Sequence, residues 1–364
     1  MALLKIKKDK ILDNIKFLDK YFEEKKRKWT LVLKVLGGNK ELLRHILNKK
    51  LLKNVHSIGD SRLSNLRAIK EVSEDFVTMF LKPPIVSAAA KTVAFSDISL
   101  NTSRETIEAL NKEAKKQKKI HKVIIMIELG ELREGILREN TLNFYSKVFN
   151  LSNIDVIGIG TNLGCMYGIE PTYDKLMQLN LFNELIKAKF NKKLELVSGG
   201  SSITLPVLEQ GPVPPGINHF RIGEAVFLGT SPFDNSPFMD LHDDAFTFHS
   251  NIIELKKKPS SPDGIIGEGN VGHVSENAQQ NENEQYEKHF RAIMDFGTID
   301  IDPEEELTCF DKNVNYIGTT SDMTVFEIGK KKGDHSMGEC LAFKPNYMGV
   351  AKLMYSSHIK KIIE

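Results

Sequence analysis

The chain has 364 residues, of which 41% are hydrophobic and 27% charged, and its formal net charge is +2 at neutral pH. This composition suits a globular protein long enough for one large domain, or for a large domain with a smaller one. The near balance of charge argues against a protein dedicated to nucleic acid or to a membrane surface, so we expect neither partner. No apolar run reaches the roughly twenty residues that span a bilayer.

Two further features concern the cellular compartment. The segment from Met1 to Lys8 turns charged too early to form the apolar core of a signal peptide. The three cysteines (Cys165, Cys309 and Cys340) are too few and too scattered for a disulfide framework or a zinc site. We therefore expect a cytoplasmic protein with no metal site.

Apolar segments rich in β-branched residues alternate with segments of helical period over the first two thirds of the chain. A short strand at Leu3–Ile6 precedes an amphipathic helix from about Lys8 to Glu24. Eight more strands are predicted, at Trp29–Val35, Val55–Ile58, Phe76–Leu81, Ile98–Asn101, Val123–Leu129, Val156–Gly160, Leu194–Ser198 and Phe220–Gly223. Helices are predicted between most of them, including Lys40–Asn48, Arg62–Glu71, Thr106–Lys118 and Tyr173–Lys189. Strands that alternate with helices are parallel, and eight such units fit a closed (β/α)8 TIM-type barrel better than an open doubly wound sheet, which remains the alternative.

The pattern changes after Gly229, where helical periodicity fades. Short β-type runs follow, at Phe246–Leu255, Ala292–Phe296, Tyr316–Thr319, Thr324–Ile328 and Glu339–Phe343. A polar tract near 259–288 separates the first two and is expected to form a long exposed or partly disordered loop. We therefore predict a barrel domain over residues 1–233, of which 1–7 can join the second domain, and a mostly-β C-terminal domain over 234–364.

Barrels of this kind carry their chemistry on the loops that follow the strands. Lys34 lies in the otherwise apolar first barrel strand, where it either extends outward to water or serves as a Schiff-base lysine. Arg133 follows the fifth strand, either in a solvated turn or as a donor to a ligand oxygen. Both positions are the ones that a barrel site would use.

Small and hydroxyl residues follow the seventh strand, in the run Ser198-Gly199-Gly200-Ser201-Ser202. Such a run either binds phosphate through amides and hydroxyls or forms a turn that caps the next helix. Arg221 closes the eighth strand, where it either contributes to a phosphate site or forms a structural ion pair. The order Lys, Arg, Ser/Gly and Arg, at the carboxyl ends of the first, fifth, seventh and eighth predicted barrel strands, favours one shared site.

This order resembles the fold type III pyridoxal-phosphate enzymes of the alanine racemase superfamily, and within it the ornithine racemase group of amino-acid racemases. The matching stretches run almost the length of the chain, at 59–66, 97–101, 128–135, 158–163, 198–202, 216–224, 253–260 and 320–322.

The resemblance implies a role for each matched residue. Lys34 would form the Schiff base, Arg133 would face the phenolic oxygen of the cofactor, and Arg221 would face the pyridine nitrogen. Four positions would hold the phosphate: the side chains of Ser201 and Ser202 and the amides of Gly223 and Glu224. Asn162 and Ser198 would be further cofactor contacts.

The resemblance also implies racemisation of a free amino acid, with ornithine or another basic amino acid as candidates, by a head-to-tail homodimer. Alternatives are a non-catalytic protein that binds pyridoxal phosphate, and a related decarboxylase or aldolase. The chain departs from the family at Thr298, where alanine racemases carry a tyrosine that serves the second face of the intermediate. Candidates for that second acid or base, or for substrate contact, are Cys165, Asp322 and His358.

Overall fold

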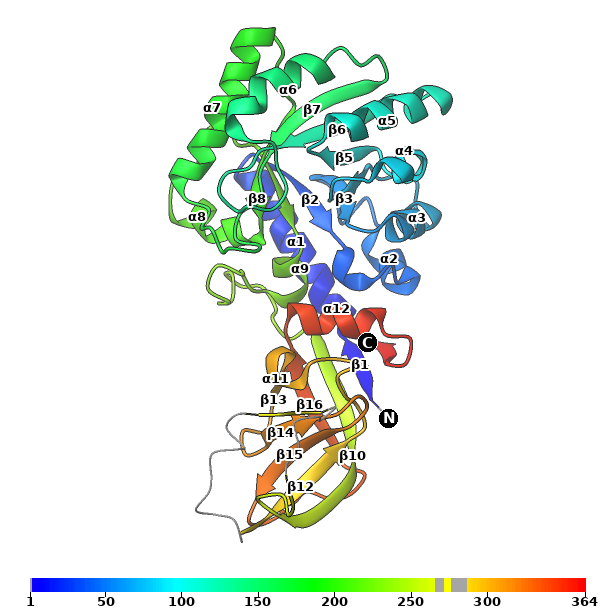
Figure 1. The fold of residues 1–364 in the computed structure, drawn as a ribbon, viewed down its shortest axis with the longest axis vertical. Helices are drawn as coiled ribbons and strands as arrows, with labels where there is room; N and C mark the ends of the chain where they lie inside the picture. The colour runs from blue at the N-terminus through cyan, green and yellow to red at the C-terminus, as the bar shows by residue number, and fades with distance from the viewer. Residues whose placement is uncertain (1, 266–271, 276–286) are drawn as a thin grey trace. The chain divides into compact units, whose positions relative to one another are not determined.

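The computed structural model describes residues 2–265, 272–275 and 287–364 (Figure 1). The chain forms two compact units. One comprises Lys10–Asp243, and the other combines the N-terminal residues through Asp9 with Asp244–Glu364. Most of the polar tract predicted as a loop lies outside the described residues.

The first unit contains a closed barrel in which each strand pairs in parallel with the next, as predicted (Figure 1). Its strands are β2 (Lys28–Val32), β3 (Val55–Asp60), β4 (Thr78–Phe80), β5 (Ile98–Asn101), β6 (His121–Met126), β7 (Ile154–Gly160), β8 (Leu196–Ser201) and β9 (His219–Ile222). The helices are α1 (Lys8–Glu24), α2 (Lys40–Ile46), α3 (Leu63–Val72), α4 (Ala89–Phe95), α5 (Arg104–Lys116), α6 (Thr141–Val148), α7 (Tyr173–Phe190), α8 (Leu205–Gln210) and α9 (Glu224–Leu228).

The strands carry apolar side chains because both faces of a parallel sheet are covered. One apolar cluster is formed by Met79, Ile98, Leu100, Ile124, Met126, Ile157 and Leu196, all buried. Other buried positions on the strands are polar, such as Thr30, Ser57 and His219. The barrel is therefore filled by side chains, and a ligand can reach only the loops at its ends.

The prediction that the first barrel strand runs to Val35 is wrong. Strand β2 ends at Val32, and a short 3-10 helix occupies Lys34–Leu36. Leu33 makes the last link to the neighbouring strand, donating its N–H to the carbonyl of Gly59 at 2.8 Å. Lys34 thus lies just beyond the carboxyl end of the strand, in an exposed position, and not within the sheet.

The second unit is mostly β, as predicted, and its main sheet has the order β11-β14-β15-β12-β10-β1-β17. Its strands are β1 (Leu3–Ile6), β10 (Phe246–Pro259), β11 (His273–Val274), β12 (Lys288–Met294), β13 (Leu307–Cys309), β14 (Asn315–Thr319), β15 (Thr324–Gly329), β16 (Cys340–Pro345) and β17 (Lys360–Ile363). The described residues of this unit also form the helices α11 (Pro303–Glu306) and α12 (Tyr347–Tyr355). The core includes the packed rings of Phe248, Phe296, Phe326 and Phe343.

Within the described ranges, no helix combines the length and the apolar character needed to cross a lipid bilayer.

Candidate active site

The turn after β2 presents Lys34 at the carboxyl end of the barrel. Two glycines follow the short helix, Gly37 with φ +59° and Gly38 with φ +73°, values that favour glycine. A Cβ at Gly38 would also lie 3.0 Å from Oδ1 of Asn65. The chain therefore turns sharply after Lys34 and packs against the start of α3.

Arg221 lies at the end of β9 and is 4% exposed. Its guanidinium donates to the carbonyl of Thr161 at 2.9 Å, to Oγ of Ser198 and to Oδ1 of Asn162. Burial lowers the pKa of Arg221 to about 10, so it stays protonated at neutral pH. The side chain is thus a fixed donor, held by neutral acceptors, between the ends of β7 and β8.

A chain of neutral groups inside the barrel supports that arginine. The Oγ of Ser198 contacts Nδ1 of His219 at 2.9 Å, and Nε2 of His219 contacts Oγ1 of Thr30 at 2.8 Å. Thr30 in turn shares a hydrogen bond of 2.7 Å with Ser57. Complete burial lowers the pKa of His219 well below its usual value, so its ring is neutral. One ring nitrogen therefore donates and the other accepts, which fixes a direction along the chain.

Arg133 reaches the same end of the barrel from the loop after β6. Its Nη2 donates to Oε1 of Glu134 at 2.7 Å, and Asn162 donates its side-chain amide to that same carboxylate. The Glu134 carboxylate raises the pKa of Arg133 above its usual value. Asn162 thus bridges Glu134 and Arg221, so that both predicted arginines belong to one network.

The loop after β7 is wrapped around a buried carboxylate, Glu131, which is 1% exposed. Its oxygens accept the backbone N–H groups of Gly164 and Cys165 at 2.9 Å, of Tyr167 at 2.7 Å and of Ile169 at 3.2 Å, and also that of Met166. This anchorage places the exposed Cys165 beside Arg133. The side chain of Cys165 also contributes to the raised pKa of Arg133.

The ends of β8 and β9 offer donors that suit a phosphate. Ser202, 2% exposed, accepts the N–H groups of Gly223 and Ala225 at its Oγ, each at 3.3 Å. Bonds this long are weak, so a phosphate oxygen would compete well for the same donors at the start of α9. Ser201, half-buried at the end of β8, is paired with Arg221 in the sheet. The donor set therefore fits a phosphorylated cofactor, with Ala225 added to the predicted amides.

Two predicted residues, Asp322 and His358, belong to the other unit. Both are exposed. Asp322 lies in the turn between β14 and β15, where the backbones of residues 320 and 321 accept hydrogen bonds from Thr298 and Ile299. A Cβ at Gly297 would lie 2.4 Å from the amide nitrogen of Asp322, so this turn and the segment aligned with the family's tyrosine are packed together.

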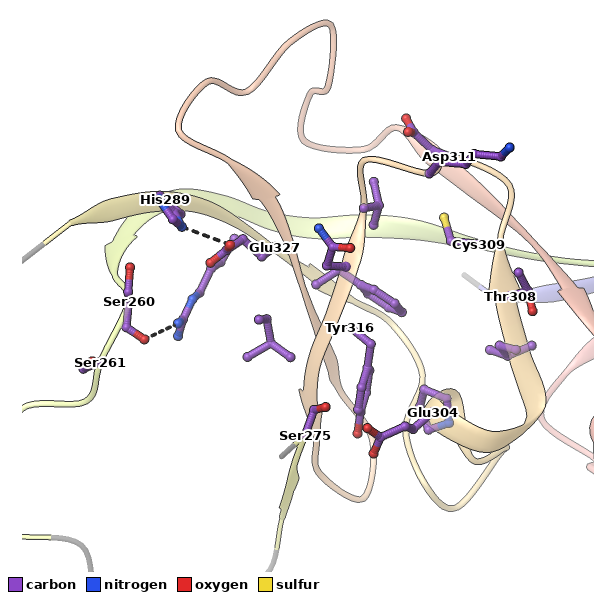
Figure 2. A pocket seen from close by; sticks show the side chains of 18 residues that line it. Ser260, Ser261, Ser275, His289, Glu304, Thr308, Cys309, Asp311, Tyr316 and Glu327 are labelled. Carbon is purple, nitrogen blue, oxygen red and sulfur yellow. Dashed lines mark hydrogen bonds and ion pairs between the residues drawn. The ribbon is translucent and has the colours of Figure 1, made fainter. Parts of the chain in front are cut away.

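A hollow of about 650 Å³ also lies in the second unit (Figure 2). There His289 pairs with Glu327 at 2.9 Å, and Nη2 of Arg291 donates to the carbonyl of Ser260 at 2.7 Å. Burial raises the pKa of Tyr316, on the same hollow, to about 12. Arg291 is thus bonded to a backbone carbonyl and His289 to a carboxylate in this hollow, whereas Lys34 and the predicted phosphate donors lie at the barrel end.

Four residues that take part in the barrel site were given no role by sequence reasoning: Asp60, Glu131, Glu134 and His219. Asp60, like Lys34, is a charged residue at the carboxyl end of a barrel strand, since it is the last residue of β3. Glu131 and His219 are defined by hydrogen-bond partners from distant parts of the chain, and Glu134 by its neighbour Arg133 together with Asn162.

Comparison with known families gives a match over most of the barrel. The family described as "Alanine racemase, N-terminal domain" matches residues 6–231. Among curated proteins, the ornithine racemase of Acetoanaerobium sticklandii is 31% identical over 354 residues, which cover 97% of each chain. The lysine racemase of Thermotoga maritima is 30% identical over 307 residues, or 84% of each chain.

Solved structures agree on the fold of the whole chain. An alanine racemase from Bartonella henselae with covalently bound pyridoxal phosphate superposes with a TM-score of 0.73 at 13% identity, covering 100% of this chain and 99% of that one. The alanine racemase of Streptomyces lavendulae gives a TM-score of 0.72 at 12% identity, covering 100% and 97%. At these identities the likeness concerns the fold.

Proposed function

The chain belongs to the alanine racemase N-terminal domain family, whose cofactor is pyridoxal 5'-phosphate, and on this premise we propose that it racemises a free basic amino acid, ornithine or lysine. The observation that carries the proposal is the similarity to an ornithine racemase over 97% of both chains. The relative named for lysine supports the same substrate class.

In this proposal Lys34 attaches the cofactor at the mouth of the barrel. Ser201, Ser202 and the amides of Gly223, Glu224 and Ala225 hold its phosphate. Arg133 would hold its phenolic oxygen, and Asn162 and Ser198, which both accept hydrogen bonds from Arg221, would be further cofactor contacts. When bound, pyridoxal phosphate withdraws electrons from the substrate Cα and so makes the Cα proton labile.

Arg221 would hold the pyridine nitrogen of the cofactor and in that position would favour racemisation over competing reactions. Because its pKa is about 10, Arg221 would donate a hydrogen bond to that nitrogen and keep its own proton at neutral pH. An unprotonated ring nitrogen is a weaker electron sink, which favours prompt return of the proton to Cα.

Inversion at Cα needs a proton donor on each face of the substrate. Lys34 serves one face. For the other face, or for contact with the substrate side chain, we retain Cys165, Asp322 and His358. The last two would be supplied by the second subunit of a head-to-tail homodimer, which we propose as the working form of a cytoplasmic enzyme.

The first experiment measures racemisation and identifies the lysine that binds the cofactor, using the same protein preparation. Purified protein supplied with pyridoxal phosphate should convert L-ornithine or L-lysine to the racemate, as measured by chiral chromatography. Borohydride should fix the cofactor on the peptide that contains Lys34, and Lys34→Ala should abolish both results because the attaching amine is lost.

Matched controls separate this proposal from its alternatives. Lys28→Ala, at the opposite end of the same strand, should still racemise the substrate, and borohydride should still fix the cofactor on Lys34. Bound cofactor without Cα exchange on any amino acid in heavy water would indicate a binding protein. Release of carbon dioxide or aldehyde would indicate a decarboxylase or aldolase. Failure to bind the cofactor at all would refute the proposal.

A further inference from the structure

The barrel interior contains a row of polar side chains that leads along neighbouring strands to Arg221. Thr30 on β2 pairs with Ser57 on β3 and with Arg221 on β9. Ser198 on β8 pairs with His219 on β9. The four residues that precede Arg221 in this row are each at most 1% exposed. Branched apolar side chains are the usual filling of such a barrel, and a buried polar group is costly without a hydrogen bond. Each of these four groups therefore needs a partner inside the barrel.

Arg221 sets the direction of the hydrogen bonds in this row, because a guanidinium has donors and no acceptor. Its Nη1 donates to Oγ of Ser198, and the hydrogen-bond contact that remains for the hydroxyl proton of Ser198 is Nδ1 of His219, at 2.9 Å. The ring of His219 is neutral, so its Nδ1 accepts and its Nε2 carries the proton. That proton is donated to Oγ1 of Thr30, which lies 2.8 Å from Nε2.

The same direction continues toward the opposite end of the barrel. Because Thr30 accepts from the ring, its own hydroxyl donates to Oγ of Ser57 at 2.7 Å rather than to the sulfur of Met79 at 3.8 Å, a weak acceptor. Oγ of Ser57 lies 3.3 Å from Nδ1 of His56, whose Nε2 lies 3.5 Å from the carboxylate of Glu195. Burial lowers the pKa of His56, so its Nδ1 can accept at neutral pH. The row thus begins at a cation and ends at a carboxylate.

We propose that Thr30, Ser57 and His219 are positioning residues for Arg221, which act through this one-way chain of hydrogen bonds across the barrel. Hydrogen bonds in a chain polarise one another, so a Ser198 hydroxyl that donates onward is a stronger acceptor for the guanidinium. The chain thereby holds Arg221 in one orientation at the end of β9. This assignment deepens the proposed function and rests on it for its consequence in catalysis.

The orientation of Arg221 decides the outcome of the proposed reaction. An arginine held at the pyridine nitrogen keeps that nitrogen unprotonated, whereas a loosened one admits water, which can protonate the nitrogen and strengthen the electron sink. More turnovers then end with the substrate amino group on the cofactor, which gives a 2-oxo acid and pyridoxamine phosphate in place of the inverted amino acid. A merely structural defect would lower both outcomes in the same proportion.

The first measurement uses the cofactor-free chain. Nitrogen NMR of protein that carries isotope-labelled histidine identifies which ring nitrogen holds the proton, and the signal of His219 is assigned by its absence from His219→Gln. His219 should be protonated at Nε2 alone. In Thr30→Val that proton loses its acceptor, so its resonance should move upfield, and Thr30→Ser, which keeps the hydroxyl, should restore the wild-type position.

The second measurement uses enzyme loaded with pyridoxal phosphate. Thr30→Val should raise the ratio of amino transfer to racemisation about fivefold, the effect of weakening one buried hydrogen bond. Chromatography of pyridoxamine phosphate and chiral chromatography of the amino acid give this ratio, and Thr30→Ser should return it to the wild-type value. Ser57→Ala removes the next link, should change the ratio in the same direction, and keeps the test decisive if Thr30→Val does not fold.

Ser99→Ala is the matched control. Ser99 forms the same kind of buried pair on β5 and β6, where its Oγ lies 2.8 Å from Nε2 of His121. The replacement should shift the signal of His121 and leave both the tautomer of His219 and the ratio of the two reactions unchanged.

The histidine signals need no cofactor, so they are independent of the racemase proposal. A proton on Nε2 of His219 that responds to Thr30→Val, in a chain that racemises nothing, would retain the chain of hydrogen bonds and refute the function. A proton on Nδ1 of His219 in the wild type would overturn the proposal, as would an unchanged ratio in folded and active Thr30→Val and Ser57→Ala.

Discussion

Buried ionisable side chains at the barrel end are stabilised in three different ways. Arg221 keeps its charge among neutral acceptors, Glu131 is surrounded by backbone donors, and His219 loses its charge altogether. A buried charge without such compensation would be strongly destabilising. These arrangements fix the positions of the groups before any ligand arrives, which is what precise proton transfer requires.

Replacing Glu131 by Gln should loosen the loop that carries Cys165. Glutamine offers one acceptor oxygen in place of two and adds a donor among backbone N–H groups, so the free energy of unfolding should fall by about 1–3 kcal/mol. Hydrogen exchange should quicken at residues 164–169. Glu170→Gln, an exposed neighbour on the same loop, should change neither measurement. Equal effects of the two variants would contradict the assigned role.

The same replacement predicts a dependence on pH. Burial acts to raise the pKa of Glu131, but the backbone N–H groups outweigh it, so the folded pKa lies below the ordinary 4.5. A carboxylate with a lowered folded pKa stabilises the fold above its unfolded pKa, and the benefit is lost as pH falls through the folded value. The stability difference between wild type and Glu131→Gln should therefore be constant near neutrality and shrink below about pH 4.5.

At the scale of elements, the site depends on how each strand ends. The turn after β2 combines positive φ with close packing, and these two requirements can be separated by comparing Gly38 and Gly168. Their φ values are +73° and +71°, but a Cβ at Gly38 meets Asn65 at 3.0 Å, whereas a Cβ at Gly168 meets nothing within 4 Å.

Both Gly38→Ala and Gly168→Ala should lose about 1–2 kcal/mol of stability for the left-handed backbone. Gly38→Ala should lose about 1 kcal/mol more because its methyl group displaces Asn65. Chemical denaturation measures both losses, and equal losses of stability in the two variants would show that the contact with Asn65 is unimportant.

The helices and strands also show how much of the structure could be predicted from sequence patterns. Alternating strands and helices predicted the barrel, and charged residues within or just after apolar strands indicated Lys34, Arg133 and Arg221 as candidates. The end of β2 was misplaced because Leu33 and Val35 are as apolar as the strand itself. The partners of Glu131 and His219 lie up to 189 residues away in the chain, so only the folded structure brings them together. Helix α12 and strand β17 were missed because their short apolar runs do not distinguish helix from strand.

At the scale of the whole molecule, the candidate residues are divided between two units. Lys34 and the cofactor donors belong to the barrel unit, whereas Asp322 and His358 belong to the β unit. If a head-to-tail homodimer builds each site from the barrel of one subunit and the β unit of the other, defects in different units should complement each other. The relevant pair is Lys34→Ala and Asp322→Lys, each expected to be inactive alone because one lacks the amine and the other obstructs the site with an opposite charge.

Unfolding and refolding the two variants together in equal amounts should restore about a quarter of the wild-type activity. Half of the dimers formed at random are mixed, and each mixed dimer has one site in which both contributions are intact. Lys34→Ala mixed with Arg221→Ala should restore nothing, because both defects lie in the barrel and no mixed site is whole. Native mass spectrometry would verify that mixed dimers are present. Mixed dimers of the first pair without activity would show that the β unit of one subunit does not complete the site of the other.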